Sequence, residues 1–116
     1  MQYLLLIYDN EKQFEIMPKE ELGAFMGAYN TFSAEVAKSG HLVGGNRLHN
    51  IDRATTVRIR EGKQQITDGP FAETREQLGG YYLINAKNLD EATAIAARIP
   101  SAKTGSIEIR PIYDAE

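Results

Sequence analysis

Asp68 is the first candidate for chemistry, because it stands in a turn whose residues restrict the backbone. Asp binds its own downstream backbone, Gly69 permits a positive φ, and Pro70 fixes φ. A carboxylate held in this way at the mouth of a cleft could act as a general acid or base. The alternative is an Asx-type turn, in which the carboxylate only accepts backbone N–H groups. The sequence leaves both interpretations open.

A charged segment follows the turn and could complete a binding site with it. Phe71 can anchor the turn to the core, and Glu73, Arg75 and Glu76 come within the next five residues. A guanidinium such as that of Arg75 can clamp a carboxylate or phosphate of a ligand. The alternative is a set of local ion pairs on a surface loop, which stabilise little. We predict a ligand-binding loop made of Asp68, Phe71, Glu73, Arg75 and Glu76.

The two histidines are weaker candidates for catalysis. His41 or His49 could form a proton-transfer pair with Asp68, because histidine side chains titrate near neutral pH. His41 follows Gly40 and also suits the start of a strand, whereas His49 lies in a polar segment.

Tyrosine hydroxyls could line an apolar pocket, although core and dimer-interface positions suit the same residues. The chain has six: Tyr3, Tyr8, Tyr29, Tyr81, Tyr82 and Tyr113. Without cysteine, and with its two histidines not clustered, the sequence shows no spacing of metal ligands, so we expect neither a metal nor a cofactor. Gly44-Gly45 lacks the Lys-Ser/Thr of a phosphate-binding loop.

Composition predicts one globular domain over residues 1–116. Hydrophobic residues make up 42% of the chain and charged residues 25%, as in globular proteins that fold in water. The net charge of −3 argues against a nucleic-acid partner, which requires a basic face. The opening residues lack a signal-peptide pattern, and no apolar run approaches a membrane span. We therefore expect a cytoplasmic protein with no membrane partner.

Periodicity predicts two helices and six strands. The predicted helices cover residues 18–39, with one apolar stripe, and residues 88–99, which end before Pro100. The predicted strands cover residues 2–8, 41–48, 55–60, 63–67, 80–85 and 106–113. In strand 55–60 we expect Val57 and Ile59 to point inward and Arg58 and Arg60 outward.

This element order predicts an α+β, ferredoxin-like split βαβ fold with an extra β-hairpin. Two helices would cover one face of an antiparallel sheet. Strands 2–8 and 80–85 are apolar on both faces, so the second face would expose tyrosine and leucine side chains to water. The economical solution is a homodimer, with sheet packed against sheet.

Four segments also resemble a known family. They are TDGPFAETREQLGGYYLI from Thr67, GG at Gly44, ATTVRIREGK from Ala54 and GSIEIRPI from Gly105. The chain resembles the YCII-related, DGPF-domain family along nearly its whole length. The resemblance implies a small bacterial dimer with a ferredoxin-like fold of the dimeric α/β-barrel type. Some relatives have been suggested to be enzymes, and some are adjacent or fused to sigma-factor domains. A suggested His–Asp pair of the family has no matching histidine motif here.

Two functions follow from these observations. The first is a small-molecule site in a cleft near Asp68, where any catalysis would be acid–base chemistry without a cofactor. The alternative is a non-catalytic regulatory module that contacts the transcription machinery. An enzyme needs Asp68 in a concave site with a second titratable group, whereas an interaction module needs only an exposed patch.

Overall fold

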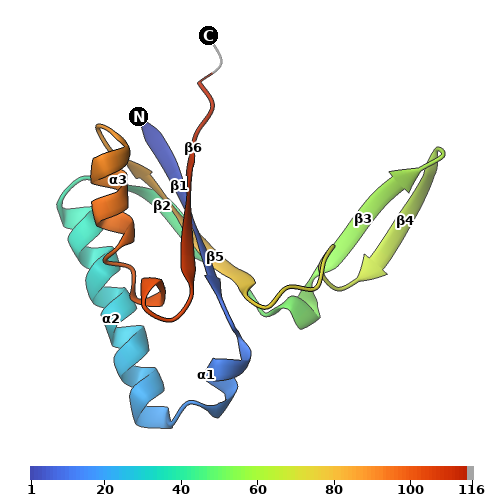
Figure 1. Cartoon of the computed structure of the whole chain (residues 1–116), viewed down its shortest axis with the longest axis horizontal. Helices are drawn as coiled ribbons and strands as arrows, with labels where there is room; N and C mark the ends of the chain where they lie inside the picture. Colours follow the sequence, from blue (N-terminus) through green and yellow to red (C-terminus); the bar gives the residue numbers. More distant parts are fainter. Residues whose placement is uncertain (115–116) are drawn as a thin grey trace.

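The computed structural model describes residues 1–114. A four-stranded antiparallel sheet carries helices on one face, and a two-stranded hairpin projects from this body (Figure 1). The elements are β1 (Gln2–Asp9), α1 (Lys12–Ile16), α2 (Lys19–Lys38), β2 (Leu42–Arg47), η1 (Ile51–Arg53), β3 (Thr55–Arg60), β4 (Lys63–Asp68), β5 (Gln77–Asn85), α3 (Leu89–Ala96), η2 (Pro100–Ala102) and β6 (Ser106–Pro111).

The sheet has the strand order β2-β5-β1-β6, and each neighbouring pair is antiparallel. Two β-α-β units, β1-α2-β2 and β5-α3-β6, interleave so that β1 and β5 lie side by side in the centre. The predicted α+β, split βαβ fold with an extra hairpin is therefore confirmed. The short helix α1 and the two 3₁₀ turns were not predicted, because each covers too few residues to show a period.

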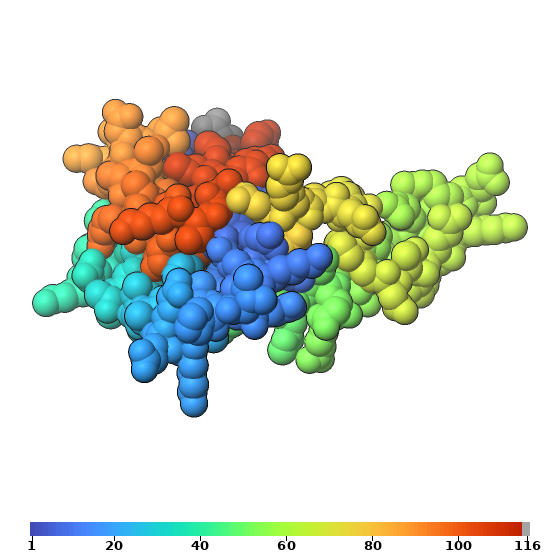
Figure 2. Space-filling view, turned by 60° about the horizontal axis from the view of Figure 1, so that its bottom comes forward, coloured from blue at the N-terminus to red at the C-terminus, as the bar shows by residue number. Residues whose placement is uncertain are grey.

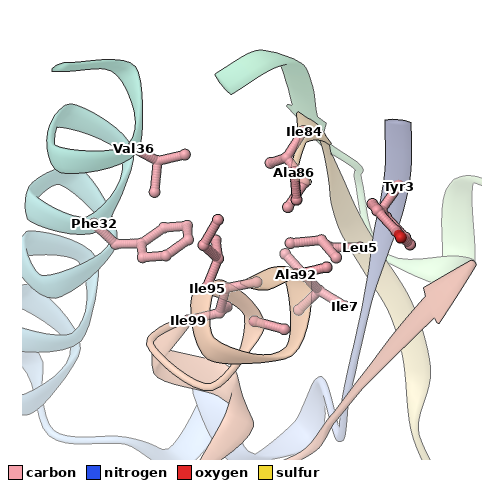
Figure 3. Close-up of a cluster of buried hydrophobic side chains, with 11 residues drawn as sticks. Tyr3, Leu5, Ile7, Phe32, Val36, Ile84, Ala86, Ala92, Ile95 and Ile99 are labelled. Carbon is pink, nitrogen blue, oxygen red and sulfur yellow. The ribbon is translucent and has the colours of Figure 1, made fainter. Parts of the chain in front are cut away.

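The core lies between the sheet and the helices α2 and α3 (Figure 3). Alternate side chains of β1 point into it, because successive residues of a strand face opposite sides. Burying one such aliphatic side chain stabilises the fold by about 1.5–3 kcal/mol. The buried hydrophobic residues are Tyr3, Leu5, Ile7, Phe32, Val36, Ile84, Ala86, Ala92, Ile95, Ala96 and Ile99.

Local signals set the helix ends. Gly40 follows α2 with φ +82°, a left-handed conformation that favours glycine. The side chain of Asn88 accepts a hydrogen bond from the backbone N–H of Glu91 and so caps α3. Helix α3 ends at Ala96, earlier than predicted, and Pro100 opens η2 instead of following directly on the helix.

The hairpin β3–β4, called the arm below, projects away from the body (Figure 2). Its strand bounds agree with the sequence to within one residue, but the expected side-chain orientation is wrong. Val57 and Ile59 are 58% and 57% exposed, whereas Arg58 is partly buried. The inward prediction assumed that the hairpin packs on the sheet. In the structure the arm leaves the body and its apolar face is bare.

The sheet face opposite α2 and α3 is called the open face below. It carries the second alternating set of β1, which includes Leu4 and Leu6, opposite Leu83 and Tyr81 of β5. These side chains are partly exposed. Among residues 1–114, no helix is both long and apolar enough to span a membrane.

Candidate functional site

A cavity of about 360 Å³ opens between α2 and the end of the sheet. It is called the α2 cavity below. Its volume lies within the range of roughly 300–1,000 Å³ typical of small-molecule sites. Its lining combines aromatic side chains with a few carboxylates, hydroxyls and amides. They include Asp9, Glu11, Phe14, Phe25, Met26, Tyr29, Asn30, Ser33, Arg47, Asn50, Gln77, Tyr82 and Ser101.

The apolar stripe of α2 builds one wall of this cavity. Phe32 and Val36, in the second half of the helix, are buried in the core. Phe25, Met26 and Tyr29, nearer to the N-terminal end of the helix, are only partly buried and line the cavity. The 20-residue helix is about 30 Å long, so one stripe serves both the core and the site.

Two glycines set the spacing of the strands beneath the cavity. A Cβ atom at Gly45 would lie 2.7 Å from the carbonyl oxygen of Tyr81, and one at Gly80 would lie 2.8 Å from that of Asn46. Real Cβ atoms do not come this close to backbone oxygen atoms. The close approach of β2 and β5 therefore requires glycine at both positions.

Three aromatic rings make the apolar side of the cavity continuous. The ring centroids of Phe14 and Phe25 are 5.2 Å apart, and those of Phe25 and Tyr29 are 5.4 Å apart in an edge-on arrangement. Such pairs stabilise by about 0.5–1.5 kcal/mol beyond the area they bury. Helix α1, which carries Phe14, is thereby held against α2.

Two hydroxyl pairs face the cavity. The hydroxyl of Tyr29 donates to Oγ of Ser101 at 2.6 Å, and the hydroxyls of Tyr82 and Ser33 are 2.6 Å apart. Burial raises the pKa of Tyr29, and the hydrogen bonds with Ser101 offset part of that rise. Tyr29 is therefore a neutral hydroxyl at neutral pH. These groups can exchange hydrogen bonds with a bound molecule.

Asp9 supplies a buried carboxylate at the edge of the cavity, with only 6% of its surface exposed. It accepts hydrogen bonds from Oγ1 of Thr104 at 2.8 Å, from the backbone N–H of Asn10 at 3.2 Å, and from the side chain of Gln13. The backbone of Gly105 lies so close to the end of β1 that a Cβ atom at this position would overlap the carbonyl oxygen of Tyr8. Donors from the segment that follows β1 and from Thr104, before β6, thus fix the carboxylate in place.

Glu11 connects the cavity to the root of the arm. Its carboxylate accepts the backbone N–H of Ile51, with an oxygen–nitrogen distance of 3.2 Å, and its own N–H donates to Gln77 at 3.0 Å. Arg47 and Asn50, which lead into the arm, also line the cavity. One wall of the site therefore depends on how the arm is held.

Asp68 does not lie in this cavity. It ends β4 opposite Thr55 and is exposed. The expected cleft beside Asp68 is therefore wrong for the single chain, because the arm carries this residue away from the body. Gly69 does adopt the predicted positive φ, +106°, and its N–H donates to Ala54 at 2.8 Å. A role for Asp68 in ligand binding or catalysis stays a prediction.

The remaining members of the predicted loop are also separate from the cavity. Phe71 is 77% exposed and does not anchor the turn to the core, contrary to expectation. Glu73 and Arg75 are exposed. Glu76 is partly buried and accepts a hydrogen bond from Oγ of Ser106 at 2.8 Å. The structure therefore does not gather the predicted loop into one concave site.

Neither histidine is paired with Asp68. Nδ1 of His41 lies 2.7 Å from Oγ of Ser39, and its Nε2 lies 3.2 Å from a carboxylate oxygen of Glu91. His41 thus connects the end of α2 to the start of α3. His49 is exposed in the loop after β2.

Sequence reasoning missed Asp9, although the sequence held a signal for it. The alternation that buries Tyr3, Leu5 and Ile7 continues by two residues to Asp9, which places a carboxylate on the inner face. A buried carboxylate in line with a hydrophobic stripe needs hydrogen-bond partners and therefore marks a specialised site. Among the described residues, no three His, Cys, Asp or Glu side chains cluster as metal ligands would.

The model of the YCII-related domain matches residues 1–116. The chain belongs to this family. An uncharacterized protein of Rhizobium meliloti (strain 1021) is 38% identical over 114 residues, which are 97% of this chain and 92% of the relative. The family resemblance that the sequence motifs indicated is therefore confirmed.

A solved structure similar to this YCII-related chain is that of 5-chloro-2-hydroxyhydroquinone dehydrochlorinase from Burkholderia phenoliruptrix AC1100, in complex with 2,5-dihydroxybenzoquinone. The TM-score is 0.53, and the match covers 99% of this chain and 96% of the enzyme. The two sequences are 12% identical, so the likeness concerns the fold alone.

Proposed function

We propose that this YCII-related protein binds a small hydroxylated aromatic molecule in the α2 cavity. One observation carries the proposal. A wall of aromatic rings from Phe14, Phe25 and Tyr29 shares a cavity of about 360 Å³ with the buried carboxylate of Asp9. An apolar cavity with a few fixed polar groups is the usual form of a small-molecule site.

The polar groups define the chemistry of the ligand. Carboxylates only accept hydrogen bonds when ionised, so Asp9 and Glu11 suit a ligand that donates through ring hydroxyls. An uncharged ring also suits the site, because a negatively charged ligand would be repelled by these two carboxylates. The enzyme with the similar fold binds a ring that carries two hydroxyl groups, which makes this ligand class a reasonable first probe.

Acid–base catalysis stays a prediction. If it occurs in the α2 cavity, residues other than Asp68 would carry it out. Asp9 and Tyr29 both line the cavity, and no cofactor enters the proposed chemistry. The alternative of a regulatory module near the transcription machinery also stays a prediction, as does a cytoplasmic location.

The protein is also proposed to act as a homodimer through the open face. Leu4 and Leu6 of β1 lie there opposite Leu83 and Tyr81 of β5, on the side away from the core that α2 and α3 cover. Sheets that expose such apolar side chains are normally covered by another layer. A second copy would supply that layer.

A direct binding test uses resorcinol and 1,5-dihydroxynaphthalene, followed by NMR saturation transfer and chemical-shift titration. The variant Asn30→Trp places a large ring at an exposed position of α2 that lines the cavity. Ala34→Trp adds the same ring one turn further along α2, at an exposed position outside the cavity lining. Binding should weaken at least tenfold in the first variant and stay within twofold in the second.

A second pair of variants separates the two candidate carboxylates. Asp9→Asn removes the charge within the cavity, and Asp68→Asn removes it on the exposed arm. We expect Asp9→Asn to weaken resorcinol binding and Asp68→Asn to leave it unchanged. Loss of binding in Asp68→Asn alone would transfer the site to the turn and contradict the proposal.

A further inference from the structure

The arm exposes the face that its sequence would bury. Its strands pair Val57 with Ile66 and Ile59 with Gln64, which places three aliphatic side chains on one side of the ribbon. Val57, Ile59 and Ile66 are 58%, 57% and 60% exposed. This surface is called the apolar arm face below.

The opposite side of the ribbon is contacted by the loop that follows β4. Oγ1 of Thr56 donates to the carbonyl oxygen of Gly69 at 2.8 Å, and the guanidinium of Arg58 donates to that of Phe71 at 3.2 Å. The loop after β4 therefore lies against the polar side. Hydrogen bonds within the chain hold this side, and the described residues leave the apolar arm face in solvent.

A ribbon of this kind does not hold its shape well by itself. An isolated two-stranded hairpin in water is marginally stable at best. The arm also makes the chain unusually extended. The radius of gyration of the chain is 16.3 Å, whereas a compact domain of this length has about 13 Å. The space-filling view shows the arm standing clear of the body (Figure 2). A contact outside the single chain would therefore stabilise it.

We propose, building on the homodimer proposed above, that the apolar arm face docks on the second copy of this chain, so that each arm reaches across to the other subunit. One chain carries both surfaces that need cover, the apolar arm face and the open face. A two-fold arrangement buries both at once and leaves no free end for further association.

The size of the exposed surface supports a second copy of the chain as the partner of the arm. Four strands about 4.8 Å apart and about 20 Å long present an open face of roughly 400 Å². A stable interface buries about 800 Å² on each partner. The open face alone falls short of this value. Two exchanged arms extend the same interface toward the expected size, because each subunit then both gives and receives an arm.

The first test charges the apolar arm face. Ile66→Lys and Gln65→Lys add the same side chain at adjacent exposed positions of β4, which point to opposite sides of the ribbon. Sedimentation equilibrium should show a dimer for the wild type and for Gln65→Lys. For Ile66→Lys the dimer dissociation constant should rise at least tenfold. A wild-type monomer at 100 μM, or equal dimers in both variants, would overturn the proposal.

The second test needs no variant and so does not depend on how Ile66→Lys folds. Lys63 is the only lysine of β3 and β4 and stands next to the tip of the arm. Protein labelled with ¹⁵N is mixed with unlabelled protein and treated with an amine-reactive cross-linker. Arm docking predicts mixed-isotope peptides that join Lys63 of one copy to a lysine of the body of another. Cross-links from Lys63 that stay within single chains would contradict it.

Discussion

Gly105→Ala should be among the most damaging single changes in the protein, although it adds one methyl group. The new Cβ would overlap the carbonyl oxygen of Tyr8 and lie 2.9 Å from a carboxylate oxygen of Asp9. The obstacle is mainly backbone, so β6 must shift away from β1. The change therefore disturbs the strand pair and the buried carboxylate together.

The magnitude follows from the hydrogen bonds at risk. Those of the Asp9 carboxylate contribute about 1.5–3 kcal/mol each when a charged group is involved. Losing one of them and part of the β1–β6 pairing should cost about 3–4 kcal/mol. In a domain of this size that corresponds to a fall in melting temperature of roughly 10–15 °C.

The assay is thermal unfolding followed by circular dichroism, with Gly27→Ala as the matched control. Gly27 lies within α2, is exposed, and has open space around its Cβ position. Alanine there should stabilise the helix by about 0.5–1 kcal/mol. A Gly105→Ala protein that melts within 2 °C of the wild type would refute the packing argument around Asp9.

Three further predictions concern single groups. Asn88→Ala removes the cap of α3 and should lower stability by about 1 kcal/mol in urea denaturation, whereas an unchanged midpoint would deny the cap. The backbone N–H of Lys87 holds the pKa of Glu91 below its usual value. The stability that ionised Glu91 contributes is therefore present above about pH 4.5 and is lost as the pH falls through the lowered pKa. Glu91→Gln should flatten the acid side of the plot of stability against pH. Ser33→Ala deprives the hydroxyl of Tyr82 of its partner and should cost about 1 kcal/mol and weaken resorcinol binding, whereas wild-type values in both assays would exclude the pair from the site.

The sequence predicted the fold well, because its strongest signals are periodic. The alternation along residues 2–8 and the stripe of residues 18–39 determine which faces meet, and the structure agrees with both. Short elements such as α1 carry no period, and Phe14, which it contributes to the cavity, was therefore missed.

The position of Asp68 relative to a cleft could not be predicted from the sequence. Gly69 adopts the predicted positive φ, but Asp68 itself ends β4 and the chain only bends after it. Whether a turn borders a cleft depends on where its hairpin points, and nothing local in the sequence determines that direction. The alternation of Val57 and Ile59 is as compatible with packing against a partner as with packing within the chain.

The most direct test of the account asks where a ring binds. Isotope-filtered NMR of the protein with resorcinol measures contacts between ligand ring protons and protein side chains. The account predicts contacts with Phe25, Met26 and Tyr29 of the α2 cavity. Contacts confined to Phe71 and the residues around Asp68 would contradict it and return the site to the turn.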